Sequence, residues 1–155
     1  MRVVVDTNIV FSAILNTNSR ISKIILQPKS LLNFYSTEQL EDELAEHWNK
    51  LKNISKYSDI ELHKVVKIVT SKIRFINVGL ISRSLFRKAE ELARDIDVDD
   101  TEFIALTEHI RGKLWTGDKR LIKGLKTKKW QKLISTDELY EIVTVPHSRS
   151  FAAKH

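Results

Sequence analysis

The sequence predicts an α/β fold of three layers, α/β/α, built on a mainly parallel sheet of four or five strands. Short apolar runs rich in β-branched residues alternate with segments of helical periodicity. This alternation favours right-handed crossovers, which place strands side by side and helices on both faces of the sheet. The chain has 155 residues, 42% hydrophobic and 30% charged, and no internal repeat or linker. We therefore expect one domain over residues 1–145 and a C-terminal tail over residues 146–155.

Five short apolar runs bounded by polar residues are the expected strands, at residues 3–5, 31–35, 73–78, 113–116 and 132–135. Helices are expected between them, from residue 36 to about residue 51 and over 59–70, 84–96, 99–110, 119–125 and 137–143. The clearest helix begins at Ser36, because Ser36 and Gln39 match a capping box. An apolar stripe at helical spacing follows, made of Leu40, Leu44, Trp48 and Leu51.

The composition excludes several classes of protein. The chain has no cysteine, so a disulfide scaffold, a thiol nucleophile and a cysteine-based metal site are excluded. It has no glycine-rich nucleotide loop and no G-x-S-x-G element, and its 5 histidines show no metal-ligand spacing. No segment approaches the roughly 20 apolar residues that span a membrane. We expect a cytoplasmic protein without a secretory signal and without a membrane partner.

The positive charge is concentrated in one part of the chain. The net charge is +6, and the segment 111–132 holds nine basic residues against one acid. Such a segment is typical of a surface that binds RNA or DNA, although a solvated surface with surplus lysines is the alternative. Trp130 within it either stacks on a base or packs half-buried. The expected nucleic-acid-binding residues are Lys119, Arg120, Lys123, Lys126, Lys128 and Lys129.

Acidic residues follow the predicted strands. Asp6 comes after the first strand, Asp100 opens a helix, and Asp118 comes after the fourth strand. The carboxyl ends of parallel strands share one edge of a sheet, where ligands bind, so these acids are expected to meet there. Glu43 or Glu41, which flank the apolar stripe on opposite sides, would add a fourth acid. Each Asp has an alternative role as a helix cap.

Several carboxylates at one edge point to a metal site. They repel one another and raise one another's pKa unless a cation neutralises them. Carboxylate oxygens are preferred by hard divalent ions such as Mg²⁺ and Mn²⁺. An acidic, metal-loaded pocket near a basic segment is suited to phosphodiester hydrolysis, in which the ions hold the phosphate and activate water while lysines hold the backbone.

Four elements in order carry a resemblance to a known family. They are Asp6-Thr7-Asn8, a helix with Leu40-Glu43-Leu44, Asp100-Thr101 followed by the apolar run 103–106, and Thr116-Gly117-Asp118 ahead of Leu121-Ile122. Over roughly residues 1–143 the sequence resembles a PIN domain, the fold of many toxin–antitoxin ribonucleases and of some RNA-processing nucleases.

The resemblance implies a PIN-like nuclease domain that cleaves single-stranded RNA with Mg²⁺ or Mn²⁺. It implies that the catalytic and metal-binding residues are Asp6, Glu43, Asp100 and Asp118, with Asn8 and Thr116 as supporting residues. It also implies a homodimer and an antitoxin partner. Many relatives carry another acid soon after Thr-Gly-Asp, but here Lys119 and Arg120 follow. Whether one or two ions bind is therefore open.

Two other functions remain. The first is a nucleic-acid-binding or partner-binding domain that keeps the fold without catalysis. The second is a phosphatase with an Asp nucleophile at position 6, although such enzymes typically have a second acid two residues later, where this chain has Asn8.

Overall fold

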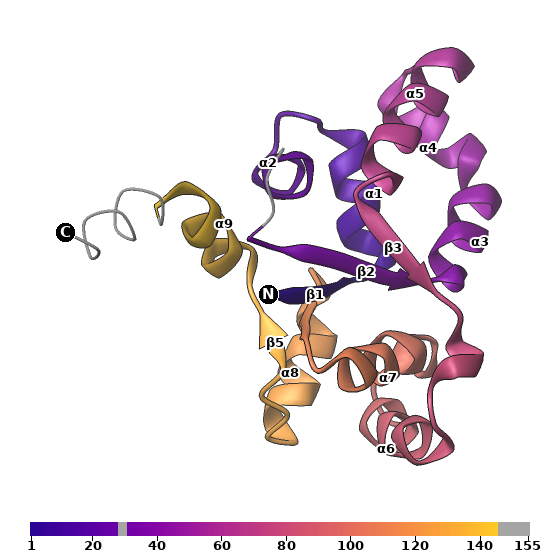
Figure 1. The fold of residues 1–155 in the computed structure, drawn as a ribbon. Helices are drawn as coiled ribbons and strands as arrows, with labels where there is room; N and C mark the ends of the chain where they lie inside the picture. Colours follow the sequence, from indigo (N-terminus) through magenta and orange to yellow (C-terminus); the bar gives the residue numbers. More distant parts are fainter. Residues whose placement is uncertain (28–30, 146–155) are drawn as a thin grey trace.

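The structure is a computed structural model that describes residues 1–27 and 31–145. A five-stranded sheet in the order β3-β2-β1-β4-β5 forms its centre, and every neighbouring pair of strands is parallel. The strands are β1 (Arg2–Val5), β2 (Asn33–Thr37), β3 (Ile73–Ile76), β4 (Lys113–Trp115) and β5 (Leu133–Ile134). The expected parallel sheet between helices is confirmed (Figure 1).

Helices cover both faces of the sheet. One layer consists of α1 (Thr7–Leu15), α2 (Arg20–Leu26), α3 (Glu38–Glu46), α4 (Trp48–Ser55), α5 (Asp59–Thr70) and α9 (Thr136–Thr144). The other consists of α6 (Arg83–Ala93), α7 (Thr101–Ile110) and α8 (Lys119–Thr127). Two short 3₁₀ turns, η1 (Val78–Leu80) and η2 (Val98–Asp100), precede α6 and α7. The result is the expected three-layer α/β/α architecture.

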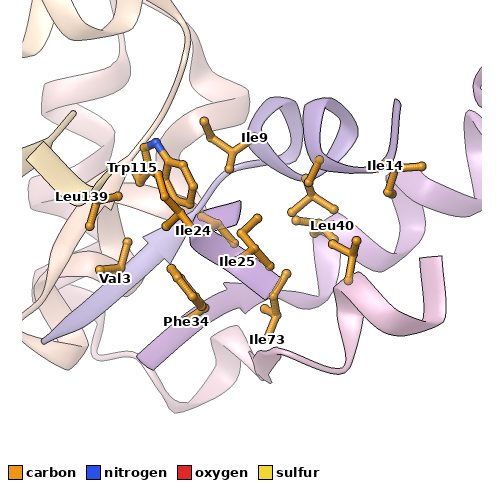
Figure 2. Packing of buried hydrophobic residues seen from close by; sticks show 14 of the residues in the cluster. Val3, Ile9, Ile14, Ile24, Ile25, Phe34, Leu40, Ile73, Trp115 and Leu139 are labelled. Carbon is orange, nitrogen blue, oxygen red and sulfur yellow. The ribbon is translucent and has the colours of Figure 1, made fainter. Parts of the chain in front are cut away.

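The alternation of side chains along the strands separates two apolar cores. Val3 and Val5 of β1 face the core under the larger layer, and Val4 faces the core under the smaller one. Figure 2 shows the larger core, in which Trp115 packs near Phe34 and Ile24. Because all three valines are fully buried, β1 is a central strand with both faces covered.

The parallel register brings the carboxyl ends of β1, β2 and β4 to one edge. Val5 is opposite Trp115, and Val4 is opposite Tyr35. The Ser36 hydroxyl donates a 2.8 Å hydrogen bond to the carbonyl of Val5, which ties β2 to β1 at this edge. Residues that follow these strands therefore emerge close together.

The prediction that Ser36 caps a helix is wrong. Ser36 lies within β2, which runs from 33 to 37 rather than from 31 to 35, and its hydroxyl bonds across the sheet. The helix starts one residue later than the capping box requires, after Thr37, whose side chain makes no cap hydrogen bond. The cross-strand bond satisfies the buried hydroxyl, so tertiary pairing replaced local capping.

The long helix expected from residue 36 to residue 51 is divided in two. His47 ends α3 and begins α4 with φ −100° and ψ 17°, outside the α-helical range. Its stripe is nevertheless buried as expected, with Leu40, Leu44 and Leu51 in the larger core. The helix α2 was not expected from the sequence.

The C-terminal tail expected over 146–155 lies outside the described residues. In the part of the chain that the structure describes, no helix combines the length and the apolar character that crossing a bilayer requires.

Candidate active site

An acidic cavity of about 480 Å³ opens at the carboxyl edge of the sheet. Its lining comes from the residues after β1, from α3, from the turn before α7, and from the start of α8. Among the described residues that line it, none is a lysine or an arginine. Eight carboxylates line it: Asp6, Asp42, Glu43, Glu46, Asp97, Asp99, Asp100 and Asp118. All four acids expected from the sequence are among them.

Asp6 lies at the floor of this cavity, where β1 ends. Its side chain is 3% exposed, and its Oδ1 accepts a 3.0 Å hydrogen bond from the Ile9 N–H, so it caps α1. Burial, together with the charges of Asp118 and Glu43, raises the pKa of Asp6 to about 6, although hydrogen bonds from Thr116 and Ile9 act to lower it. An ionised Asp6 is therefore short of compensating positive charge.

Asp118 and Thr116 come from the turn between β4 and α8. Asp118 caps α8 through Oδ1, which accepts from the N–H groups of Arg120 and Leu121 at 3.0 and 3.1 Å. The Thr116 hydroxyl accepts a 3.1 Å hydrogen bond from the Asp118 N–H and also lies beside Asp6. Thr116 thus contacts the Asp6 carboxylate and the backbone of Asp118. Asn8 lines the cavity from the first turn of α1 and is exposed.

Asp100 occupies the position before α7, but its side chain makes no cap hydrogen bond. The expected capping role is therefore wrong for this residue. Burial raises the pKa of Asp100 to about 7, and the charges of Asp97, Asp6 and Asp118 contribute in the same direction. Its Oδ2 is buried and has no hydrogen-bond partner within the described residues. A buried carboxylate oxygen without a partner is well suited to accept a cation.

The structure distinguishes between Glu43 and Glu41, which the helical pattern alone did not. Glu43 is half-buried and lines the cavity, whereas Glu41 is exposed and lies outside it. Gln39 donates a 2.7 Å hydrogen bond from Nε2 to Glu43 Oε1 and reaches the carbonyl of Asp99 at 3.3 Å. Gln39 therefore fixes one carboxylate and joins α3 to the turn before α7.

Sequence reasoning missed several residues of the cavity. Asp42 and Glu46 share the face of α3 that carries Glu43, and helical spacing could have identified them. Asp97 and Asp99 come from the turn before α7, where Asp97 caps η2 by accepting a 2.9 Å hydrogen bond from the Asp99 N–H. His47 lines the cavity from the break between α3 and α4, and no sequence pattern indicated this position.

Five of the six expected basic residues are exposed, and Lys128 is partly buried. Lys119, Arg120 and Lys123 are exposed in the first half of α8, next to the capping Asp118. Lys126 and Lys129 are exposed farther along and line a separate cavity of about 300 Å³.

Lys128 and Trp130 have structural roles, contrary to the expectation for Lys128. The Lys128 ammonium pairs with Asp95 and donates to the carbonyl of Leu92 at 2.9 Å, which closes the end of α6. Trp130 is 7% exposed, and its Nε1 donates a 2.8 Å hydrogen bond to Glu108. Packing, rather than base stacking, is therefore the role of Trp130.

The chemistry of the cavity fits a hard divalent cation. Its donors are carboxylate oxygens, two of them with raised pKa and one with an unpartnered buried oxygen. Within residues 1–27 and 31–145, no group of three or more acidic or histidine side chains is already arranged to hold a metal ion. Asp6, Glu43, Asp100 and Asp118 are the lining residues that could hold one through their carboxylate oxygens.

Comparisons with known proteins agree with this architecture. A family model described as a PIN domain matches residues 4–138. Among solved structures, the chain is similar to a chain of the crystal structure of VapBC2 from Rickettsia felis bound to a DNA fragment from their promoter. The TM-score is 0.63 at 15% sequence identity, over 87% of this chain and 97% of the other. No curated protein matches the sequence.

Proposed function

This chain belongs to the PIN domain family, and we propose that it is a divalent-metal-dependent endoribonuclease that cleaves single-stranded RNA at the acidic cavity. The observation that carries the proposal is the gathering of Asp6, Glu43, Asp100 and Asp118 in one cavity without a lysine or an arginine among its described lining residues. Asp118 and Glu43 raise the pKa of Asp6, and Asp6 and Asp118 raise that of Asp100. Crowded carboxylates of this kind are typical of sites that bind a cation.

A bound Mg²⁺ or Mn²⁺ would supply positive charge for the scissile phosphate and favour ionisation of the attacking water. The protein's part is to hold the carboxylates in place. Asp6 and Asp118 are fixed because each caps a helix through Oδ1, and Gln39 fixes Glu43. Asp100, whose pKa is about 7 in the metal-free protein, would release its proton on binding the ion.

The phosphodiester backbone needs positive charge outside the acidic cavity. Lys119, Arg120 and Lys123 are exposed at the start of α8, and this helix begins directly after Asp118. We propose that these three residues bind the phosphates of the RNA that enters the cavity. Lysine and arginine hold phosphates without reading the base sequence. Lys126 and Lys129 extend this surface along the chain, and Lys128 does not belong to it.

The proposal includes a cellular role as the toxin of a toxin–antitoxin pair. The similar structure contains VapBC2 with promoter DNA, and the likeness in fold supports an antitoxin partner for this chain. A homodimer is proposed on the same family grounds. Light scattering of the purified protein, alone and with the product of a neighbouring gene, tests both assemblies.

RNA cleavage tests the proposal. A mixed-sequence single-stranded RNA is incubated with the protein in Mn²⁺, in Mg²⁺ and in EDTA. We expect cleavage with a metal ion and none in EDTA. The cleavage rate of the Asp6→Asn variant should fall by more than about 100-fold. Replacing a residue that only supports a metal ligand already lowers metal affinity or activity by about 10–100-fold.

The matched control is Glu41→Gln, which removes an acid from the same region outside the cavity and should leave the rate unchanged. Full activity of the Asp6→Asn variant would show that the acidic cavity is not the site of cleavage. A folded wild type that binds RNA but cuts none in any metal would favour the non-catalytic binding domain.

A further inference from the structure

A second charged surface lies at the opposite edge of the sheet from the acidic cavity. Five basic residues form it, and we call them the amino-edge patch: Arg2, Lys88, Arg111, Lys113 and Lys132. Arg2 begins β1, Lys113 begins β4, and Lys132 immediately precedes β5, and these strands are neighbours in the parallel sheet. Their amino ends therefore share one edge.

Helix α7 connects the two edges. Asp100 in the acidic cavity precedes its first residue, and Arg111 of the patch follows its last. A helix of 10 residues is about 15 Å long at about 1.5 Å per residue. The patch is therefore a separate surface. Its Lys88 comes from α6, which Figure 1 shows beside α7 on one side of the sheet.

A buried carboxylate organises the patch. The Glu108 side chain is 5% exposed and forms ion pairs with Lys132 at 2.7 Å and with Lys88 at 3.2 Å. It also accepts a 2.8 Å hydrogen bond from the Trp130 Nε1. These contacts lower the pKa of Glu108 to about 2 despite its burial. Because each ammonium has three donors, Lys132 and Lys88 keep donors for a ligand after bonding to Glu108.

The loop before β4 is held against the start of β1. Arg2 Nη1 donates a 2.9 Å hydrogen bond to the carbonyl of Ile110, at the end of α7. A Cβ on Gly112 would lie 2.6 Å from the Arg2 carbonyl oxygen, so only glycine permits this close approach. Lys113 donates to the carbonyl of Gln131 at 3.1 Å. The positions of the cations are thus fixed by the fold.

The patch surrounds a concave surface with a net positive charge. A cavity of about 700 Å³ is lined by Arg111, Lys113, Lys132, His109, Glu108 and Leu85, together with Gly112. The lining contains three cations, Arg111, Lys113 and Lys132, and one carboxylate, Glu108, which is already paired. Arg111 is exposed, and its planar guanidinium suits bidentate contact with a phosphate.

We propose that the amino-edge patch binds backbone phosphates of the single-stranded RNA that flanks the cleavage site. The inference rests on the proposed function and adds a second anchoring surface to it. Only an RNA long enough to reach from the cavity to the patch gains from it. The straight path of about 15 Å along α7 is the least distance that such an RNA must span.

Binding measurements without cleavage test this inference. Fluorescence anisotropy in EDTA measures the binding of a long RNA, 30 nucleotides of mixed sequence. The variant is Arg111→Gln with Lys113→Gln, which keeps the side-chain stems, and melting curves verify that it folds. The matched control, Lys64→Gln with Lys67→Gln, removes two exposed charges from α5 in the other helical layer.

We expect the patch variant to bind the long RNA at least about 10-fold more weakly, as expected from losing two charge-assisted contacts. The slope of log affinity against log salt should become shallower by about 1.4, or about 0.7 for each lost phosphate contact on a single strand. The control variant should bind this RNA with unchanged affinity.

Unchanged affinity of the patch variant for the long RNA would overturn the inference. So would a wild-type patch that prefers polyglutamate to RNA, since it would then bind an acidic protein. The assay contains no metal, so it can fail or succeed independently of catalysis. Absence of cleavage by the wild type would count against the proposed function and leave the binding result to stand.

Discussion

Asp6 and Asp118 each combine two roles in one carboxylate. Both cap a helix through Oδ1, and both line the acidic cavity. Capping and a place in the site were alternatives at the level of sequence, yet they are compatible here because a carboxylate has a second oxygen. Capping also makes these side chains rigid, which is useful for residues that must meet a ligand in a defined geometry.

Gln39 provides a residue-scale prediction. It holds Glu43 Oε1 at 2.7 Å and joins it to the carbonyl of Asp99, so it should position one ligand of the metal. We expect Gln39→Ala to weaken Mn²⁺ binding by about 10–100-fold, the usual effect of removing a residue that orients a metal ligand. Isothermal titration calorimetry with Mn²⁺ measures the effect.

Glu41→Ala on the exposed side of α3 is the control and should bind Mn²⁺ like the wild type. The melting temperature of the metal-free Gln39→Ala protein separates loss of positioning from loss of fold. Equal Mn²⁺ affinity in Gln39→Ala and the wild type would contradict the positioning role.

The residues of the site were predictable to different degrees. Asp6 and Asp118 follow apolar strands, so the geometry of a parallel sheet was sufficient to place them at one edge. Glu43 required the family resemblance, because helical angles alone did not separate it from Glu41. His47 and Asp97 were beyond prediction, since their positions depend on a helix break and a 3₁₀ turn that have no sequence signature.

At the scale of elements, α7 connects the chemistry of the two edges. Its first turn follows Asp100, and its last turn contains Glu108, which pairs with Lys132 and Lys88. Replacing Glu108 leaves two lysines and the Trp130 Nε1 without their partner. Both lysines are partly exposed and can regain water, so we expect Glu108→Gln to lower the free energy of unfolding by only about 1–3 kcal/mol at pH 7.

The same pair gives a pH dependence with a defined sign. The pKa of Glu108 is about 2, below its ordinary value of 4.5, so its ionised form stabilises the folded protein. That stabilisation is complete above about pH 4.5 and is lost as the pH falls towards 2. Urea unfolding at several pH values should therefore show the difference between wild type and Glu108→Gln shrinking across this window. If the difference in free energy of unfolding between the two proteins stays constant from pH 7 to pH 2, the ionised Glu108 does not stabilise the fold.

Element boundaries were harder to predict than element types. The strands and most helices follow the pattern of apolar residues, and α5 spans residues 59–70 as expected. Ser36 misled the sequence reasoning because its hydroxyl has a partner across the sheet, at Val5, that a local motif cannot reveal. Lys128 was misassigned for a similar reason, since its partner Asp95 is 33 residues away.

Acidic and basic side chains gather at opposite edges of the sheet, so the charge of the whole molecule is unevenly distributed. Carboxylates gather at the carboxyl edge of the sheet, and the amino-edge patch lies at the other. The net charge alone, +6, would have suggested an evenly basic protein. A polyanion is repelled by the metal-free cavity and attracted to the basic surfaces, so metal binding is expected to decide whether RNA enters the cavity.

The fold as a whole was predictable because its signals agree. Alternating apolar strands and helices lead to a parallel sheet with both faces covered, and the fully buried β1 has the unbroken valine run that such a strand requires. The order of the strands was less accessible. It depends on where each crossover helix packs, and the apolar pattern does not encode that choice.

Calorimetric titration of Mn²⁺ into the metal-free protein directly tests whether the acidic cavity is a metal site. The wild type and Asp6→Asn are titrated at pH 7 in two buffers of different ionisation enthalpy. The second buffer reveals protons released on binding, because Asp100, with a pKa of about 7, must ionise to bind the metal.

We predict that the wild type binds Mn²⁺ with proton release and that Asp6→Asn binds more than about 100-fold more weakly, beyond the effect of a supporting residue. The metal-free variant should melt no lower than the wild type, because removing one crowded carboxylate relieves repulsion. Equal Mn²⁺ binding by the two proteins, or none by the wild type, would contradict the account.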